Sequence, residues 1–241
     1  MISLSKYNMI NLFKKEALIV KYLNSYMETI YSFENKLIVQ NKFKSFPPFL
    51  PKNLFKNAKN AAVLIPLCVY NNKPSILFCQ RSMKVRSHRG QVCFPGGMQE
   101  ENGESLIQTA LRETQEEIGV SLKDSDVWGS FGGCASQNGQ SYVTPVVANI
   151  GKLNWDKIIE NSNEVNFTFA RSLEFLCEPK NIGYTISRFS SNNADKVYKI
   201  PVFGGFNNDF PRIWGLTALF THQFLHLLLP EYFKGIELNL G

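Results

Sequence analysis

Three glutamates near the middle of the chain have the spacing of one helix face. Glu113, Glu116 and Glu117 stand at i, i+3 and i+4, so a helix would bring their carboxylates together. Like charges at this spacing repel, and two of the three would lie near the negative end of the helix dipole. A divalent cation would offset both costs, and all-oxygen ligands favour Mg²⁺ or Mn²⁺ and phosphate chemistry. The alternative interpretation is an exposed acidic helix face that binds no ligand.

The same stretch has an apolar stripe that could face a core. Its members follow one another at i, i+4, i+7 and i+11: Ile107, Leu111, Thr114 and Ile118. Gly119 then suits the position after a helix, where a left-handed conformation is needed. We therefore expect a helix over residues 104–118, with the stripe buried and the glutamates on a different face.

The segment that carries these glutamates resembles the Nudix box, GX5EX7REUXEEXGU, in which U is apolar. Residues 112–120 match its second half, with Thr114 less apolar than usual, and Glu104 stands at the required distance before Arg112. One departure is that six residues, not five, separate Gly97 from Glu104. The resemblance implies an α/β (α+β) fold: a Nudix-type α/β/α sandwich with a mixed β-sheet and a loop–helix–loop catalytic motif.

Nudix hydrolases use water to cleave a nucleoside diphosphate linked to another group, and the resemblance assigns roles to this motif. It implies that Glu113 and Glu117 bind the metal directly, and that Glu116 binds it directly or through water. Arg112 would orient the carboxylates by charge-assisted hydrogen bonds; the alternative is an ordinary surface ion pair. Glu164 is a candidate general base, because many Nudix proteins carry a glutamate in such a loop. Otherwise Glu164 is an ordinary acid at a helix N-terminus.

Residues 77–97 are similar to the signature of the coenzyme A diphosphatase branch of the Nudix family. The positions that match in register are Arg81, Ser82, Arg86, Gly90, Phe94, Pro95, Gly96 and Gly97, and the departures are Phe78 and Cys79. The extra residue before Glu104 is usual in this branch. The similarity spans residues 61–229. It implies hydrolysis of coenzyme A or acyl-CoA to 3′,5′-ADP and 4′-phosphopantetheine or its acylated form.

Cationic side chains close to the glycines would suit this substrate, which carries a diphosphate and a separate 3′-phosphate. The predicted substrate-binding residues are Arg81, Arg86, His88, Arg89, Gly96 and Gly97. Arginine offers paired donors to phosphate, and a glycine backbone can approach an anion closely. The alternative for the basic residues is a solvated loop.

Two other functions stay open. One is a Nudix hydrolase that acts on NADH, ADP-ribose or capped RNA. The other is a binding module on a Nudix fold that has lost catalysis; the presence of Arg112, Glu113, Glu116 and Glu117 argues against it.

The remaining elements suggest a mixed sheet with helices. Strands are expected at residues 61–70, 75–80, 91–94, 127–131, 142–150 and 196–202, and the third is expected to stop at residues 95–97. Residues 164–175 should change from extended to helical, and residues 216–229 should form a helix. That helix carries His222 and His226 without the glutamate that a zinc protease needs, which favours a structural role.

The N-terminal part differs from the rest of the chain. Residues 8–44 have helix-compatible apolar spacing, and a proline-rich stretch at 46–51 is typical of a linker. We therefore expect a Lys-rich, partly helical extension over residues 1–60 and a Nudix hydrolase domain over residues 61–241.

Composition limits the remaining possibilities. The chain has 241 residues, of which 44% are hydrophobic, which is enough to form a core. No apolar run reaches the roughly 18 to 20 residues of a membrane span, and the start lacks the plan of a secretory signal. Five cysteines without a CxxC pair favour neither a disulfide framework nor a zinc knuckle. We expect an intracellular protein that is not secreted and has no membrane partner.

The formal net charge of +6 is concentrated at the N-terminus. Residues 1–60 hold ten lysines and three acids, whereas residues 61–241 hold sixteen basic and seventeen acidic residues. This distribution argues against a nucleic-acid partner. The resemblance implies a small-molecule substrate, coenzyme A or acyl-CoA, and the oligomeric state is left open. The resemblance allows a mitochondrion or a peroxisome. However, residues 1–60 lack arginine, and the final residues are not a peroxisomal signal of the SKL kind.

Overall fold

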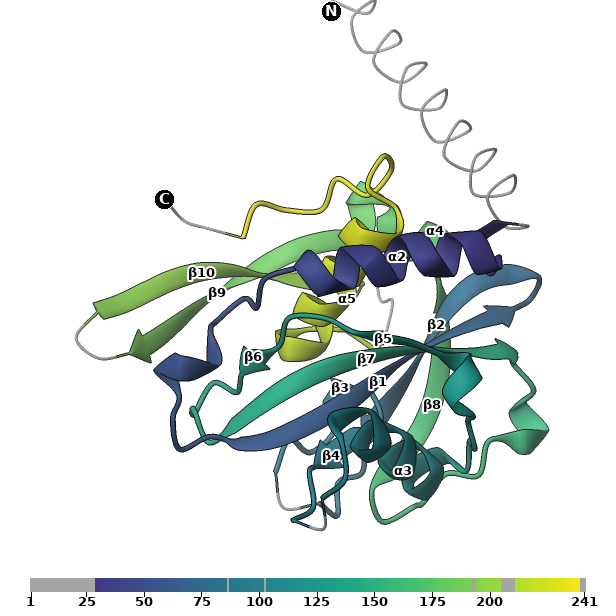
Figure 1. Cartoon of the computed structure of the whole chain (residues 1–241), viewed down its shortest axis with the longest axis horizontal. Coiled ribbons are helices and arrows are strands. Elements are labelled where there is room, and N and C mark those ends of the chain that lie inside the picture. Colours follow the sequence, from purple (N-terminus) through teal and green to yellow (C-terminus); the bar gives the residue numbers. More distant parts are fainter. Residues whose placement is uncertain (1–28, 86, 102, 192–193, 205–210, 239–241) are drawn as a thin grey trace, which may run out of the picture.

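A mixed β-sheet forms the centre of the molecule (Figure 1). The computed structural model describes residues 29–85, 87–101, 103–191, 194–204 and 211–238, and not the side chains of 188–196. The sheet runs β3-β2-β1-β7-β5, and β8 pairs with β2, β4 with β1 and β6 with β7. Its strands are β1 Lys59–Tyr70, β2 Lys73–Arg81, β3 Val92–Cys93, β4 Gly96–Met98, β5 Val127–Ser130, β6 Cys134–Ala135, β7 Ser141–Lys152 and β8 Val165–Ser172.

The longest strands of this sheet also define its register. β1 and β7 run parallel, with Leu64 opposite Val146, whereas β1 and β2 form an antiparallel hairpin. Asn71 and Asn72 connect that hairpin with φ values of 49° and 57°. Two consecutive left-handed residues are what a tight two-residue hairpin turn requires, and asparagine tolerates them better than most side chains.

Helices cover both faces of the sheet. Helix α3, Leu106–Ile118, lies on one face, and α2, Phe33–Ser45, and α5, Gly215–Leu228, lie on the other (Figure 1). Ala62 and Leu64 of β1 pack towards α3, whereas Ile65 and Leu67 belong to the large core that includes α2 and α5 residues. This alternation follows from the two-residue period of a strand. The predicted α/β/α sandwich with a mixed sheet is therefore confirmed.

The remaining elements lie at the end of the chain and in short turns. Strands β9, Ile182–Ser191, and β10, Ala194–Phe203, form a two-stranded ribbon. Helix α4, Leu173–Cys177, directly follows β8, as expected for a segment that changes from extended to helical. Short 3₁₀ turns lie at Lys52–Leu54, Asp124–Asp126, Trp155–Lys157 and Pro179–Asn181. None of the helices in the described residues is long and apolar enough to cross a bilayer.

The sequence-based predictions missed two strands, β4 and β9. The third expected strand does stop before residues 95–97, since β3 ends at Cys93, but Gly96 begins a separate strand, β4, which pairs with β1. Strand β9 was not expected at all, since polar residues such as Thr185 and Ser187 interrupt its apolar pattern. Its pairing with β10 supplies the backbone hydrogen bonds that hold it extended.

Part of the predicted N-terminal extension belongs to the main core. Ile30, Val39 and Phe43 are buried there. Lys42 Nζ also donates to the Leu227 carbonyl, 3.0 Å away, near the end of α5. The linker expected at 46–51 is packed as well, since the Phe46 ring meets Phe131 edge-on. Residues 8–28 of the expected helix lie outside the described residues, and a division at residue 60 stays a prediction.

His222 of α5 is buried, and the half-buried ring of His226 packs against it. His222 Nε2 accepts the backbone N–H of Ile236, 3.0 Å away. Both rings also contact Phe233. Burial lowers the pKa of His222 to about 3, with the neighbouring His226 adding to the effect. A pair of neutral histidines packed in this way is consistent with the structural role that the sequence favours, which stays a prediction.

Candidate active site

Strand β4 lies against the acidic face of α3. The Gly96 N–H donates to Glu117 Oε2, 3.1 Å away. A Cβ atom at Gly97 would lie 2.4 Å from Glu113 Oε1, so the missing side chain makes room for that carboxylate. Both glycines therefore lie against carboxylates of the protein itself, and their predicted contact with a substrate phosphate stays a prediction.

Helix α3 is terminated much as its sequence indicates. It begins at Leu106, two residues later than expected, because Ser105 and Gln108 form a reciprocal capping box. It ends at Ile118 and is capped by Gly119, whose φ of 72° is left-handed. The apolar stripe does face the core, with Thr114 and Ile118 fully buried.

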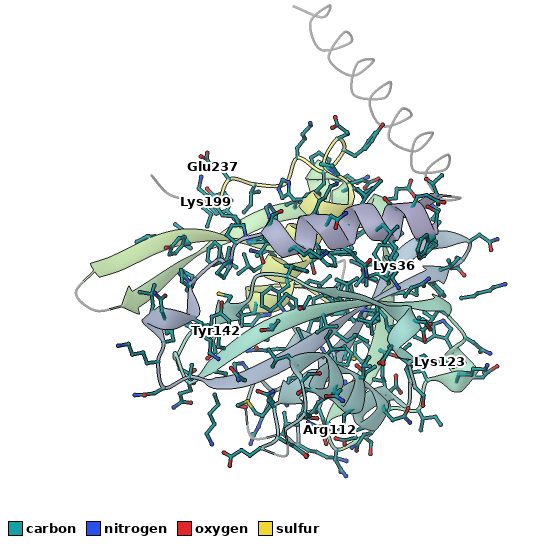
Figure 2. All side chains as sticks on the ribbon, viewed as in Figure 1. Lys36, Arg112, Lys123, Tyr142, Lys199 and Glu237 are labelled. Carbon is teal, nitrogen blue, oxygen red and sulfur yellow. The ribbon has the colours of Figure 1, made fainter. Side chains whose placement is uncertain are left out.

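Glu104, Glu113, Glu116 and Glu117 form an acidic cluster, and Arg112 donates to the first three of them. Its Nε and Nη2 atoms donate to the two oxygens of Glu104 at 3.2 and 3.1 Å. Its Nη1 donates to Glu113 Oε1 at 2.9 Å and to Glu116 Oε2 at 3.2 Å. Nη2 also donates to the carbonyl of Met98, the last residue of β4. Figure 2 shows Arg112 at the α3 side of the molecule. This pattern is far from an isolated surface ion pair.

Glu104 is a fully engaged acceptor in the loop before α3. Besides Arg112, it accepts hydrogen bonds from Thr109 Oγ1 and the Glu100 N–H, at 3.0 and 2.8 Å. The Arg112 guanidinium lowers the pKa of Glu104 to about 2, with the other donors assisting. Ionised Glu104 therefore ties the loop to the helix.

We expect the Glu104→Gln variant to lose stability in a pH-dependent way. Glu104 titrates near 4.5 when unfolded and near 2 when folded. Its contribution is therefore complete above about pH 5 and is lost as pH falls from 4.5 towards 2. Urea unfolding should show the largest difference between wild type and variant at neutral pH, and a shrinking one in acid. Glu101→Gln, at an exposed position of the same loop, is the control. A difference that grew in acid would contradict the assignment.

Glu117 is the most buried carboxylate of the cluster, with a side chain only 2% exposed. Burial raises its pKa to about 7, and the charges of Glu113 and Glu164 add to that effect. The Gly96 N–H and Arg81 act in the opposite direction. Burial also raises the pKa of Glu113. Both shifts are expected of acids crowded together away from water.

Glu164 is brought to this cluster by the loop between β7 and β8. The negative charge of Glu164 raises the pKa of both Glu113 and Glu117, because like charges repel. Its carbonyl accepts the Ser82 N–H, 2.8 Å away, just past the end of β2. The charge of the predicted general base therefore acts on two of the predicted metal ligands, and its catalytic role stays a prediction.

The predicted phosphate-binding residues are distributed unevenly. Arg81 Nη1 lies 3.7 Å from Glu117 Oε1, so Arg81 belongs to the cluster. His88 and Arg89 are exposed, and their contacts stay inside their own loop, to Gln91 and to the Val85 carbonyl. Arg86 lies outside the described residues. The substrate role of all four stays a prediction.

The residues that could hold a cation are Glu113, Glu116 and Glu117. Their oxygen donors suit a hard divalent ion such as Mg²⁺ or Mn²⁺. Within the described residues, however, no three acidic, His or Cys side chains already enclose a metal position. Arg112 holds one oxygen of Glu113 and one of Glu116, and Glu116 is 54% exposed. Direct binding by Glu116 would require it to turn away from Arg112.

Sequence reasoning missed the residues that support the loop before α3. Gln99 Nε2 donates to the Glu104 carbonyl at 2.6 Å, and Asn60 Nδ2 donates to Gln99 Oε1 at 2.8 Å. Lys52 in turn donates to Asn60 Oδ1. These residues belong to different segments, so no local motif could have revealed them.

Comparison with known proteins agrees with this architecture. The family model for the NUDIX domain matches residues 59–174. The chain is 37% identical to the mouse protein named mitochondrial coenzyme A diphosphatase NUDT8, over 72% of this chain and 80% of that protein. The chain belongs to the Nudix family. The human protein of the same name is also 37% identical, over 73% of this Nudix hydrolase and 72% of the human chain. Nudix hydrolase 3 of Caenorhabditis elegans is 35% identical, over 72% and 75%. The predicted resemblance to the coenzyme A diphosphatase branch is thereby confirmed.

Proposed function

We propose that this Nudix hydrolase cleaves the diphosphate bond of coenzyme A and its acyl derivatives, with Mg²⁺ or Mn²⁺ as cofactor. The products would be 3′,5′-ADP and 4′-phosphopantetheine or its acylated form. The observation that carries the substrate is the 37% identity to two proteins named as coenzyme A diphosphatases. The contacts of Glu113 and Glu117 with β4, together with the charge of Glu164 that acts on both, support the hydrolytic chemistry.

In this proposal the acidic residues have different roles. Glu113 and Glu117 hold the metal, with Glu116 assisting. A bound Mg²⁺ or Mn²⁺ supplies charge neutralisation and acidifies water. Arg112 keeps two of the carboxylates oriented through its donors to Glu113 and Glu116. Glu164 accepts the proton of the attacking water as general base.

The basic residues predicted to bind substrate would contact its phosphates. Arg81 is close enough to the carboxylates to contact a diphosphate held there. Arg86, His88 and Arg89 are proposed to reach the 3′-phosphate, because they follow Arg81 in the segment between β2 and β3. Gly96 and Gly97 are proposed to bind a phosphate through the backbone of β4, next to the carboxylates of Glu117 and Glu113 that contact them. Charge-assisted bonds from arginine give such contacts their strength.

The distinguishing measurement compares coenzyme A with dephospho-CoA, which lacks only the 3′-phosphate. We expect kcat/KM to be about 10- to 100-fold higher for coenzyme A, as losing one or two charge-assisted contacts would cost that much. Reactions with Mg²⁺, with Mn²⁺ and with excess chelator, analysed by mass, would identify the products and the metal need. Equal turnover of both substrates, or preference for NADH, ADP-ribose or capped RNA, would contradict the proposal.

We also propose that the protein acts inside the cell, in the mitochondrion. The support is that both mammalian relatives carry that organelle in their names. Fractionation of cells that express the full chain would test this location.

A further inference from the structure

Asn161 connects the end of the catalytic helix to the loop that carries Glu164. It lies in the segment between the 3₁₀ turn Trp155–Lys157 and β8. Its N–H donates to the Glu117 carbonyl, 2.9 Å away, and the nearby Ile159 N–H donates to the Ile118 carbonyl at 3.0 Å. The last carbonyls of a helix have no partner within it. This loop therefore completes the hydrogen bonding of α3 at the residue that bears the buried carboxylate.

The carbonyl and the side-chain amide of Asn161 form hydrogen bonds with residues 163–165. Its carbonyl accepts the N–H groups of Glu164 and Val165, each at 2.8 Å. Its Oδ1 accepts the Asn163 N–H at 3.2 Å. Its Nδ2 donates to Glu164 Oε1 at 3.3 Å. The reversed amide would put an oxygen against a carboxylate oxygen, so both contacts support this orientation.

The hydrogen bond from Asn161 to Glu164 matters because nearby negative charges repel the Glu164 carboxylate. Glu164 interacts unfavourably with the charges of Glu113 and Glu117. Glu164 is only half-buried, so its side chain could rotate towards water. A hydrogen bond from Asn161 opposes that rotation, and the backbone bond to Glu117 places the donor relative to the helix.

We propose that Asn161 is a positioning residue for the reaction, which holds the Glu164 carboxylate at a set place relative to Glu117. This inference rests on the proposed role of Glu164 as general base. Asn161 itself touches neither metal nor substrate in this scheme. Its amide group acts only through Glu164, and its backbone acts only through α3.

The Asn161→Asp variant separates this role from a merely structural one. Aspartate keeps the backbone bonds and the acceptor for the Asn163 N–H, but it loses the donor to Glu164 and adds a repelling charge. We expect kcat with coenzyme A to fall about 10- to 100-fold, as for loss of other orienting partners. KM and the thermal unfolding midpoint should change little. Asn163→Asp adds the same charge at an exposed position two residues away, and it should keep wild-type kcat.

The same substitution in a Glu164→Gln background gives the decisive comparison. Glu164→Gln alone should lower kcat by about 10²-fold or more, as for loss of a general base. Adding Asn161→Asp should then cost nothing further, since the carboxylate it orients is gone. A full additional loss in that background, or wild-type kcat for Asn161→Asp or Glu164→Gln alone, would overturn the inference. Wild-type protein that left coenzyme A intact would instead refute the proposed function.

Discussion

The Glu117→Gln variant should lose about 10³-fold in kcat towards coenzyme A while remaining folded. Glutamine preserves the size of the side chain and one oxygen, but it removes the negative charge that would bind a cation and stabilise the reacting centre. Because burial already raises the pKa of Glu117 to about 7, a neutral side chain there should not harm the fold. We expect the thermal unfolding midpoint to stay the same or rise.

Glu237→Gln is a suitable control for that experiment. Glu237 is exposed, and Figure 2 shows it at the opposite end of the view from Arg112. Its replacement removes the same charge without touching α3, so kcat should be unchanged. Steady-state rates at saturating Mg²⁺ and a calorimetric scan of each variant would complete the comparison. Wild-type kcat in Glu117→Gln would mean that the site has been assigned to the wrong carboxylates.

Gly96→Ala should destabilise the protein by about 3 kcal/mol, because the added methyl group has nowhere to go. Its Cβ would lie 2.3 Å from the Ala62 carbonyl oxygen and 2.6 Å from the Val63 Cα. Both atoms belong to the backbone of β1 in the middle of the sheet. The φ of 153° at Gly96 is also one that other residues rarely adopt. Urea unfolding followed by circular dichroism would measure the loss.

Gly97→Ala provides the matched comparison one residue away. There the added Cβ would meet the Glu113 carboxylate, with Oε1 2.4 Å away. That group ends a side chain that can rotate, so the fold should lose at most about 1 kcal/mol. Activity should fall instead, since Glu113 is displaced from the cluster. Equal losses of stability in the two variants would show that β4 is not held against β1 and α3 as described.

Local patterns in the sequence were sufficient for α3 and for the long strands of the sheet. The spacing of Ile107, Leu111, Thr114 and Ile118 defines a buried helix stripe, and Gly119 marks its end. These features depend on residues within a few turns of each other. The same is true of the β1–β2 hairpin, whose two asparagines form the turn. Such elements can be predicted because their main determinants are close along the chain.

Only the tertiary structure decided how the site is assembled. The pairing of β4 with β1 brings Gly96 and Gly97 against Glu117 and Glu113, although two glycines after a proline look locally like the end of a strand. The packing of α2 into the core likewise depends on residues far along the chain, such as Leu227.

The place of Glu164 has the same kind of origin. It reaches the cluster because Asn161 bonds to the end of α3 and Ser82 bonds to the Glu164 carbonyl. A single hydrogen bond between distant segments produces no repeating pattern in the sequence, so it cannot be predicted from one. The chain by itself therefore determined which carboxylates α3 presents, and the folded sheet and loops decided what stands opposite them.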